Sequence, residues 1–399
     1  MSRILYTRCC DGPNFSNSNM SKLCRQVSIE SPGSTLSECV FSFDVPVPDV
    51  PMYGARIRVA YAGACYRSLR TRSASICSTG SISSLSSMPG ETEGPVHGPA
   101  PAHMGLSDGA LFPGYEVAGI VDAIGKGAQD TGGLEEGSRI VLFHSEGAPR
   151  GYADYIVVSD FKCLVPVPKE LPLSVAAMLP TGALLAMNTV YSASEFLKTA
   201  FEDPVPRDKA TVLIVGTGGL ALWALRIASH HFKRVEYHDK VRITVASLKD
   251  DGFVLAQESN QIKVVQWSEH LYEKQLIERT MNMCGGPVDV VMNFGTTSRA
   301  LHRSMQCLTP GGIVLVTEEV GERLMPKFAK KAEEMQVYIV VVPNGSIEQL
   351  RQLVQLVSSG EIVPPPHTVF RAEEAQEVVR KLCASEIHGR AILKFLNVD

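Results

Sequence analysis

The strongest constraint on the fold is a short segment in the middle of the chain, where an apolar run ends in a cluster of glycines. Thr211–Val215 has the composition of a buried strand, Gly216, Gly218 and Gly219 follow it, and an apolar helical pattern begins near Gly219. Glycine tolerates tight turns with positive φ and allows another group to approach the backbone closely. Strand, glycine loop and helix in this order predict the start of a βαβ unit in a parallel sheet.

The glycine loop reads Gly216-Thr217-Gly218-Gly219-Leu220-Ala221. This is the G-x-G-x-x-(G/A) spacing, in which the first glycine turns the chain, the second admits a pyrophosphate, and a small third residue allows the helix to pack on the strand. The helix that follows presents unpaired N–H groups and a positive dipole end to phosphates. The six residues are predicted to bind a nicotinamide dinucleotide, and the alternative is a glycine turn in a Rossmann-like domain that binds no ligand.

The end of the next predicted strand indicates which dinucleotide is preferred. An acidic residue at this position would bind the ribose hydroxyls of NAD, but the chain has Ser247 there and Lys249 two residues later. A hydroxyl and a nearby cation accommodate the 2′-phosphate of NADP. NADP(H) is therefore favoured over NAD(H), although Lys249 is also an ordinary residue for the solvated start of a helix.

Beyond the glycine loop, apolar β runs alternate with helical segments as far as residue 343. This alternation is typical of a doubly wound parallel sheet with helices on both faces. The predicted strands are 211–215, 242–246, 263–266, 288–293, 313–317 and 337–342, and the predicted helices include 220–232, 269–283 and 298–308. Together with an apolar helical stretch over 173–191, they predict a dinucleotide-binding domain over 173–345.

The flanking regions predict a second domain that is mainly antiparallel β. Short β runs punctuated by Gly and Pro occur over 39–43, 55–61, 116–121, 138–143 and 153–158. Helices at 347–358 and 372–385 and a closing strand at 390–395 are expected to return to this domain. Its predicted bounds are 36–172 and 346–399. Residues 72–110 form a Ser/Gly/Pro-rich insert predicted to be a surface loop, and residues 1–35 a poorly ordered N-terminal segment with at most one strand.

Composition narrows the partners and the compartment. The net charge of −4 and pI near 6.2 do not favour a nucleic-acid partner. No apolar run approaches the roughly 20 residues of a membrane helix, and the N terminus lacks the apolar core of a secretory signal. The ten cysteines form no CxxC pair, which predicts reduced thiols and a cytoplasmic location.

At this point the sequence resembles the medium-chain dehydrogenase/reductase superfamily, which contains the zinc alcohol dehydrogenases and the zinc-free quinone and enoyl reductases. The resemblance covers roughly Phe41 to Phe395 apart from the insert. It implies an α/β protein in which a Rossmann domain is joined to a GroES-like, mainly antiparallel β catalytic domain. The segments that carry it, in addition to the glycine loop, are 46–48, 62–65, 112–119, 151–155, 176–180, 286–291, 308–316 and 388–393.

The resemblance also locates the positions that hold catalytic zinc in other members. Cys65 occupies the first position, but Tyr115 occupies the second and Thr181 the third, and Glu116 matches the acid that follows the second. Catalytic zinc needs three protein ligands, usually thiolate, imidazole or carboxylate, with one open coordination position. No metal is therefore expected, and we assign Thr181 to the cofactor-binding residues instead. The insert contains only Cys77 where other members carry four structural-zinc cysteines.

The candidate catalytic residues are those around these positions. Tyr115, Tyr66 and Arg67 are candidate hydrogen-bond donors to an oxyanion that develops during reduction. Cys65 is interpreted as a residue that lines the cleft, and Glu116 as one that braces the local fold. The pattern matches neither the zinc members nor the Asn-Pro-x-Asp run of the zinc-free branch.

Three functional readings follow. The preferred one is a zinc-independent oxidoreductase that transfers hydride from NADP(H) to a quinone, enone or small carbonyl substrate. The alternatives are a catalytically weak or inactive dinucleotide-binding protein and a divergent zinc alcohol dehydrogenase-like enzyme. The expected partners are a small-molecule substrate and a second copy of the chain, because members commonly form homodimers through the Rossmann sheet.

Overall fold

The computed structural model describes two large sheets joined by a helical segment, and a separate two-stranded sheet. The described residues are 22–29, 40–64, 114–128, 131–145, 148–149, 151–202, 208–216, 218–234, 236–237, 239–247, 262–267, 272–383, 386–387 and 389–396. Five predicted site residues and the predicted insert 72–110 lie outside them; the five residues are Cys65, Tyr66, Arg67, Thr217 and Lys249. No helix in the described part of the chain is long and apolar enough to cross a membrane.

The first sheet is the predicted doubly wound parallel sheet. Its six strands lie in the order β10-β9-β8-β11-β12-β13, and all the pairs are parallel. This is the 3-2-1-4-5-6 order, in which the chain reverses direction across the sheet between the first and fourth strands. The strands are β8 (Ala210–Val215), β9 (Val241–Ser247), β10 (Lys263–Gln266), β11 (Val288–Asn293), β12 (Leu308–Thr317) and β13 (Tyr338–Val342).

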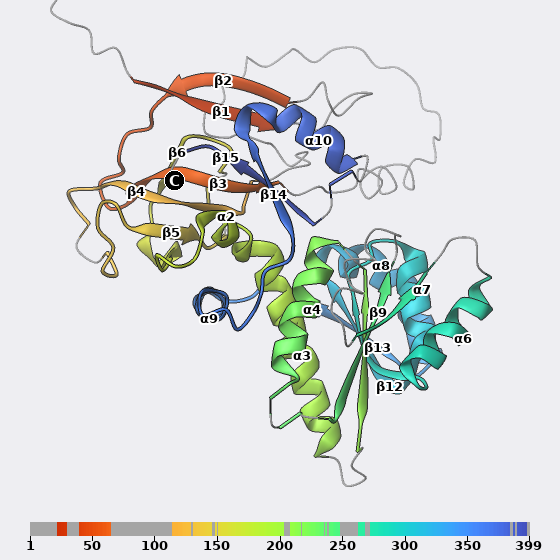
Figure 1. Cartoon of the computed structure of the whole chain (residues 1–399). Coiled ribbons are helices and arrows are strands. Elements are labelled where there is room, and N and C mark those ends of the chain that lie inside the picture. Colours follow the sequence, from red (N-terminus) through yellow and green to blue (C-terminus); the bar gives the residue numbers. More distant parts are fainter. Residues whose placement is uncertain are drawn as a thin grey trace, which may run out of the picture.

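Helices cover both faces of this sheet (Figure 1). One face packs on α3 (Leu184–Phe201) and α4 (Gly219–His231). The other packs on α6 (Glu273–Cys284), α7 (Ser298–Cys307) and α8 (Glu318–Glu334). A strand covered on both faces is buried and mainly apolar, and every residue of β11 is buried. The predicted alternation of strands and helices is confirmed, and α8 adds a helix that the sequence did not single out.

The second sheet is the predicted antiparallel domain. Its strand order is β14-β15-β3-β4-β5-β7, β6 pairs with β3, and β14 and β15 form its one parallel pair. The C-terminal segment returns to this sheet as predicted, and β14 is an additional strand. The strands are β3 (Ala55–Ala64), β4 (Val117–Ile124), β5 (Arg139–Leu142), β6 (Tyr155–Val158), β7 (Leu164–Pro166), β14 (His367–Arg371) and β15 (Arg390–Lys394).

The N-terminal segment, for which at most one strand was predicted, contains one strand in its described residues 22–29. Leu23–Ile29 forms β1, which pairs antiparallel with β2 (Val40–Pro46). The sequence over β1 mixes apolar and polar residues without clean alternation, so it resembles a loop. Cys24 and Val27 are nevertheless buried, and Asp154 accepts hydrogen bonds from the Arg25 backbone N–H and side chain. Long-range contacts, rather than local periodicity, hold this strand.

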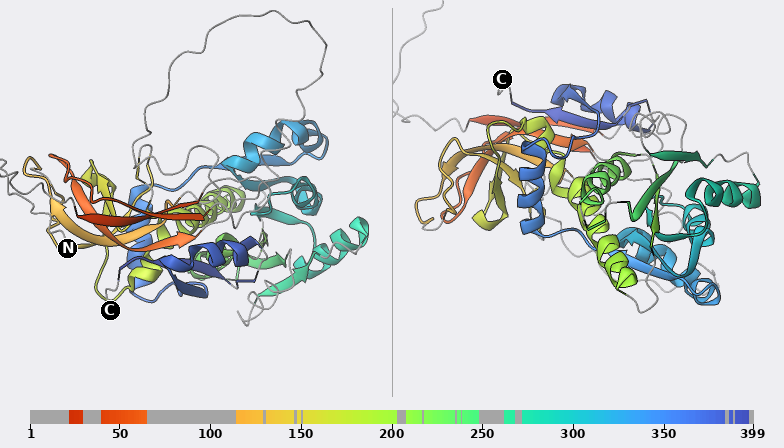
Figure 2. Two further views of the ribbon diagram at one scale, coloured as in Figure 1. Left: turned by 90° about the horizontal axis from the view of Figure 1, so that it is seen from above. Right: turned by 60° about the horizontal axis from the view of Figure 1, so that its bottom comes forward.

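A helical connection links the two sheets. It comprises α2 (Leu173–Ala176), one turn of π-helix over Leu179–Ala183, and α3. Helix α9 (Ile347–Ser358) packs against β7, the π-helical turn and α3, so it lies between the sheets, while α10 (Ala375–Cys383) covers the second sheet (Figures 1 and 2). A single buried apolar cluster includes side chains from both sides of this connection, for example Val165 and Trp223.

Candidate functional site

The glycine loop lies at the carboxyl end of β8, as predicted. Gly216 has φ of +118°, a conformation that residues with side chains rarely adopt, and its N–H donates to the Ala246 carbonyl at 2.8 Å. Ala221 is buried, and its Cβ lies 3.5 Å from the position that a Cβ on Gly216 would take. The turn and the helix packing assigned to these two residues are both present.

Gly218 is the N-cap of α4, and its surroundings suit a phosphate. Its φ and ψ are −72° and 174°, it is exposed, and a Cβ built on it would meet no atom of the described residues within 4 Å. No neighbouring side chain therefore requires a glycine here. The space in front of this backbone is open, and the first turn of α4, with Gly219 and Leu220, carries no acidic residue that would oppose an anion.

Ser247 is the last residue of β9, the position at which the ribose specificity is set. It is fully buried, and its carbonyl accepts the Trp267 N–H at 2.8 Å. A serine here leaves no carboxylate at the strand end. Lys249, the second residue of the NADP prediction, lies outside the described residues. Of the two predicted residues, the structure therefore places only Ser247.

The sequence did not identify Phe294, which lies beside the glycine loop. It follows β11, the neighbour of β8 at the reversal of strand order, and its N–H donates to the Val215 carbonyl at 3.0 Å. Its Cβ lies 3.5 Å from the Cβ position of Gly216. Ligands of doubly wound sheets bind at this reversal, beyond the carboxyl ends of the strands. The sequence feature that could have identified Phe294 is its position directly after a predicted strand.

Glu116 is a buried carboxylate at which several elements meet. The Thr181 hydroxyl donates to Oε1 at 2.5 Å and the Gly182 N–H at 3.3 Å, and both belong to the π-helical turn between the domains. Only 1% of the Glu116 side chain is exposed. Gly63, near the end of β3, is so close that a Cβ on it would overlap this carboxylate. The interpretation of Glu116 as a bracing residue agrees with these contacts.

Arg390 connects Glu116 to the glycine loop, and the sequence did not identify it as a site residue. Its Nη2 forms an ion pair with Glu116 Oε2, and its side chain is 12% exposed. Its aliphatic stem crosses the start of α4, where a Cβ on Gly219 would lie 2.2 Å from the Arg390 Cδ. A cation therefore lies at the helix N terminus that is predicted to bind phosphates. No local pattern pairs residues 274 positions apart, so this contact depends on the tertiary fold.

Tyr115 lies directly before Glu116 and stacks on His144. The ring centroids are 3.7 Å apart and the planes are inclined by 21°. Tyr115 is partly buried, and His144 follows β5. The sequence singled out Tyr115 but not His144, because a histidine in a loop carries no periodic signal. The predicted donor thus has a fixed ring position next to the Glu116 cluster.

The described zinc-position residues do not suit a zinc ion. Tyr115 offers a phenol that stacks on an imidazole, and the Thr181 hydroxyl already donates to Glu116. Neither position supplies the thiolate, imidazole or carboxylate that a catalytic zinc needs. Cys65 lies outside the described residues, and within them no three His, Cys, Asp or Glu side chains are grouped as a metal site.

Comparison with known proteins finds similarity to zinc-type dehydrogenases and related oxidoreductases. Residues 271–393 match the family model described as "Zinc-binding dehydrogenase". The "Probable zinc-binding oxidoreductase, mitochondrial" of Arthroderma benhamiae is 24% identical over 288 residues, which cover 71% of this chain and 80% of that protein. The "NADPH-dependent alkenal/one oxidoreductase, chloroplastic" of Arabidopsis thaliana is 26% identical over 245 residues, 58% of this chain and 56% of that protein.

Solved structures share the fold over almost the whole chain. The quinone oxidoreductase of Coxiella burnetii has a TM-score of 0.64 at 17% identity and covers 94% of this chain and 99% of its own. The predicted combination of a Rossmann domain and a GroES-like β domain is confirmed.

Proposed function

We propose that the chain is a member of the medium-chain dehydrogenase/reductase superfamily, to which its relatives and fold are similar. Within that superfamily, it would be a zinc-independent oxidoreductase that transfers hydride from NADPH to an enone, quinone or small carbonyl compound. The proposal rests mainly on one observation. At the N terminus of α4, Gly218 exposes its backbone and the Arg390 side chain brings a cation to the next residue. The absence of suitable zinc donors at Tyr115 and Thr181 supports the zinc-independent form.

Binding of the cofactor is assigned to the glycine loop and Arg390. The N–H groups of the first turn of α4 and the Arg390 guanidinium would face the pyrophosphate, where positive charge is favoured. Glu116 would hold Arg390 in place, and Thr181 and Gly182 hold Glu116 by their hydrogen bonds. Ser247 and Lys249 would bind the 2′-phosphate by donating hydrogen bonds to it, which favours NADPH over NADH.

The chemistry needs one hydride and one proton for each acceptor reduced. The bound nicotinamide supplies the hydride. Tyr115 is the proposed donor to the oxygen on which negative charge develops, because its hydroxyl can donate a hydrogen bond and its ring is held by the stack on His144. Cys65, Tyr66 and Arg67 are proposed to line the same cleft.

The domain assignment and the setting are part of the proposal. Residues 36–172 and 346–399 would form the catalytic domain and 173–345 the dinucleotide-binding domain, with a small-molecule substrate bound between them. We propose a homodimer located in the cytoplasm.

The direct test is NADPH oxidation by metal-depleted protein in the presence of enones, quinones and aldehydes. Turnover of at least one acceptor class, unchanged after addition of stoichiometric zinc, is expected. If NADPH binds but no acceptor is reduced, the protein is a dinucleotide-binding protein without this activity. Activity that appears only with about one zinc per chain would support the divergent zinc enzyme instead.

Tyr115→Phe tests the donor separately from the cofactor site. The substitution keeps the ring that stacks on His144 and removes the hydroxyl. The turnover number should fall by about 100-fold with little change in the dissociation constant of NADPH. Tyr53→Phe, at a side chain that is 65% exposed, is the matched control. Equal turnover of the two variants would remove Tyr115 from the mechanism.

A further inference from the structure

A large cavity lies at the edge of the parallel sheet opposite the glycine loop. Its volume is about 1110 Å³, and it is lined by the first residues of β8, β9 and β10 and the residues that end α4 and α6. Strand β8 runs from Ala210 at this cavity to Val215 at the glycine loop, a length of about 16 Å. A ligand in the cavity would therefore occupy a site separate from the proposed dinucleotide crevice.

The cavity is strongly cationic in a protein that is acidic as a whole. Its described lining residues include five cations and two carboxylates, while the chain carries a net charge of −4. One of the carboxylates, Asp289, accepts the Thr211 N–H at 2.8 Å. The cations are Lys209, Lys233, Lys240, Arg242 and Lys263, and the carboxylates are Asp239 and Asp289.

Helix ends account for only part of this charge. Lys233 follows the last turn of α4, and Arg242 donates to the Cys284 carbonyl at the end of α6, so both neutralise helix C termini. Each helix end carries only about half a negative charge. Lys209, Lys240 and Lys263 lie before or at the start of strands, and the Lys240 Nζ lies 5.8 Å from the centroid of the Phe201 ring at the end of α3. The five cations therefore exceed the partial charges of the helix ends around the cavity.

The cavity wall is apolar as well as cationic. Phe232, Ile243, Ile262 and Pro287 contribute to the lining. Gly286, with φ of +137°, presents no side chain, and a Cβ on it would lie more than 4 Å from every described neighbour. A ligand with phosphate groups at one end and an apolar or aromatic body at the other would satisfy both kinds of surface.

We propose that this cavity binds a phosphorylated organic molecule that carries at least two negative charges, such as a nucleoside polyphosphate. The lysines would contact the phosphates as point charges, and the apolar residues would contact the body of the ligand. The site is separate from the proposed reductase activity and does not depend on it.

The test is calorimetric titration of ATP, pyrophosphate and adenosine into the full chain at low ionic strength with saturating NADPH. ATP should bind more tightly than pyrophosphate, and adenosine should bind weakly. The combined variant Lys209→Gln, Lys240→Gln and Lys263→Gln should bind ATP at least about tenfold more weakly. Because these lysines lie far from the glycine loop, the variant also excludes ATP bound in the dinucleotide crevice.

The matched control removes three exposed lysines elsewhere in the same domain. Lys274→Gln, Lys327→Gln and Lys330→Gln change the net charge equally on α6 and α8. The control should bind ATP like the wild type. Equal weakening of both triple variants would show general electrostatic attraction and overturn the proposal, as would no ATP binding by the wild type. Equal affinity for ATP and pyrophosphate would contradict the proposal that the apolar residues bind an organic body of the ligand.

Discussion

Arg390 joins two parts of the candidate site that are far apart in the sequence. It pairs with buried Glu116 and crosses the first residue of α4. The glycine loop could be predicted because its function depends on local backbone geometry. The Arg390–Glu116 contact could not, because it depends on how β15, the 114–116 segment and α4 pack together.

Arg390→Leu should weaken NADPH binding while leaving a folded protein. The substitution removes a cation from the proposed pyrophosphate site and leaves Glu116 with only its hydrogen bonds to Thr181 and Gly182. Loss of one partner of a buried pair costs about 3–5 kcal/mol of unfolding free energy. The NADPH dissociation constant should rise by at least about tenfold.

Thermal unfolding and fluorescence titration measure the two effects separately. Arg371→Leu, at an exposed arginine of the same domain, is the control. An NADPH affinity equal to that of the wild type would remove Arg390 from the cofactor site.

His231 provides a pH-dependent contribution to stability. It is 8% exposed, its Nε2 lies 2.9 Å from the Ser194 Oγ, and that oxygen lies 2.6 Å from the Tyr237 hydroxyl. Burial, assisted by nearby Arg234 and His230, lowers the pKa of His231 from 6.5 to about 4. The unfolded chain therefore binds the proton at a higher pH than the folded chain.

The unfolding free energy should consequently fall as the pH is lowered from about 6.5 to about 4, by on the order of 3 kcal/mol for this group. His231→Gln keeps a hydrogen-bonding side chain and cannot titrate, so its denaturant midpoint should depend less on pH in this window. Urea unfolding at several pH values measures the difference. Parallel pH profiles for wild type and variant would contradict the assignment.

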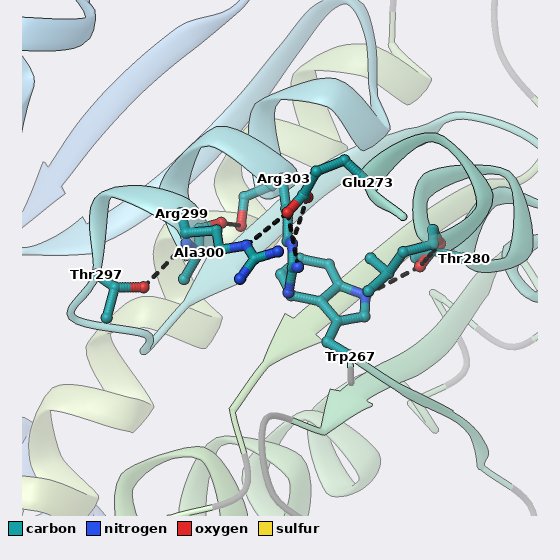
Figure 3. A network of polar contacts seen from close by, with 9 residues as sticks. Trp267, Glu273, Thr280, Thr297, Arg299, Ala300 and Arg303 are labelled. Carbon is teal, nitrogen blue, oxygen red and sulfur yellow. Dashed lines mark hydrogen bonds and ion pairs between the residues drawn. The ribbon is translucent and has the colours of Figure 1, made fainter. Parts of the chain in front are cut away.

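At the scale of elements, α6 and α7 are held together by one carboxylate and two arginines. Figure 3 shows Glu273 of α6 bonded to Arg299 and Arg303 of α7, while Trp267 donates to Thr280 at 2.9 Å. The Arg303 guanidinium lies 5.7 Å from the Trp267 ring centroid. Hydrogen bonds from Arg303, aided by Arg299, lower the pKa of Glu273 to about 2.

Glu273→Gln should destabilise the protein by about 1–3 kcal/mol, because it leaves the 4% exposed Arg303 side chain without its anion. Solvent around the 40% exposed carboxylate keeps the effect below that of a fully buried pair. Glu278→Gln is the control on the same helix, since its pair with Lys274 is exposed. Urea unfolding should separate the variants, and equal midpoints would show that the contact contributes nothing.

Helices and strands were predictable where their periodicity was strong. The α9 segment has a Ser346 capping box and a clear amphipathic pattern, and its predicted bounds are confirmed. In contrast, β1 and β14 have no clean alternation, and each lies at the edge of its sheet and pairs with the next strand along the chain. Tertiary contacts decide such elements more than local preference does.

At the scale of the whole molecule, the parallel sheet ends in an exposed edge. Strand β13 is the last strand in the order, and Tyr338, Val340 and Val341 on it are 62%, 38% and 37% exposed. An edge with apolar side chains can pair with another strand. Pairing of two β13 edges about a two-fold axis would bury these residues in a homodimer.

Light scattering coupled to gel filtration should therefore give a dimer for the wild type and a monomer for Val340→Lys. Lysine at an edge strand opposes pairing through its charge. Lys330→Gln, an exposed change on α8, is the control and should remain dimeric. A monomeric wild type at micromolar concentration would contradict the proposed assembly.

The glycine loop is the feature on which the proposed cofactor site rests, and Gly218→Ala tests it directly. The φ of −72° at Gly218 permits alanine, and among the residues that the structure describes none has an atom within 4 Å of the new Cβ. The entropy gain of about 0.4–1 kcal/mol offsets the poorer N-cap, whose cost is of similar size, so the fold should keep its stability. The Cβ would nevertheless occupy the space through which the pyrophosphate approaches the backbone.

Calorimetric titration of NADPH into the wild type and Gly218→Ala is the decisive measurement. The wild type should bind NADPH, and the variant should bind at least about tenfold more weakly with an unchanged melting temperature. Equal NADPH affinity of the two proteins, or no binding by the wild type, would contradict a nicotinamide dinucleotide site at this loop.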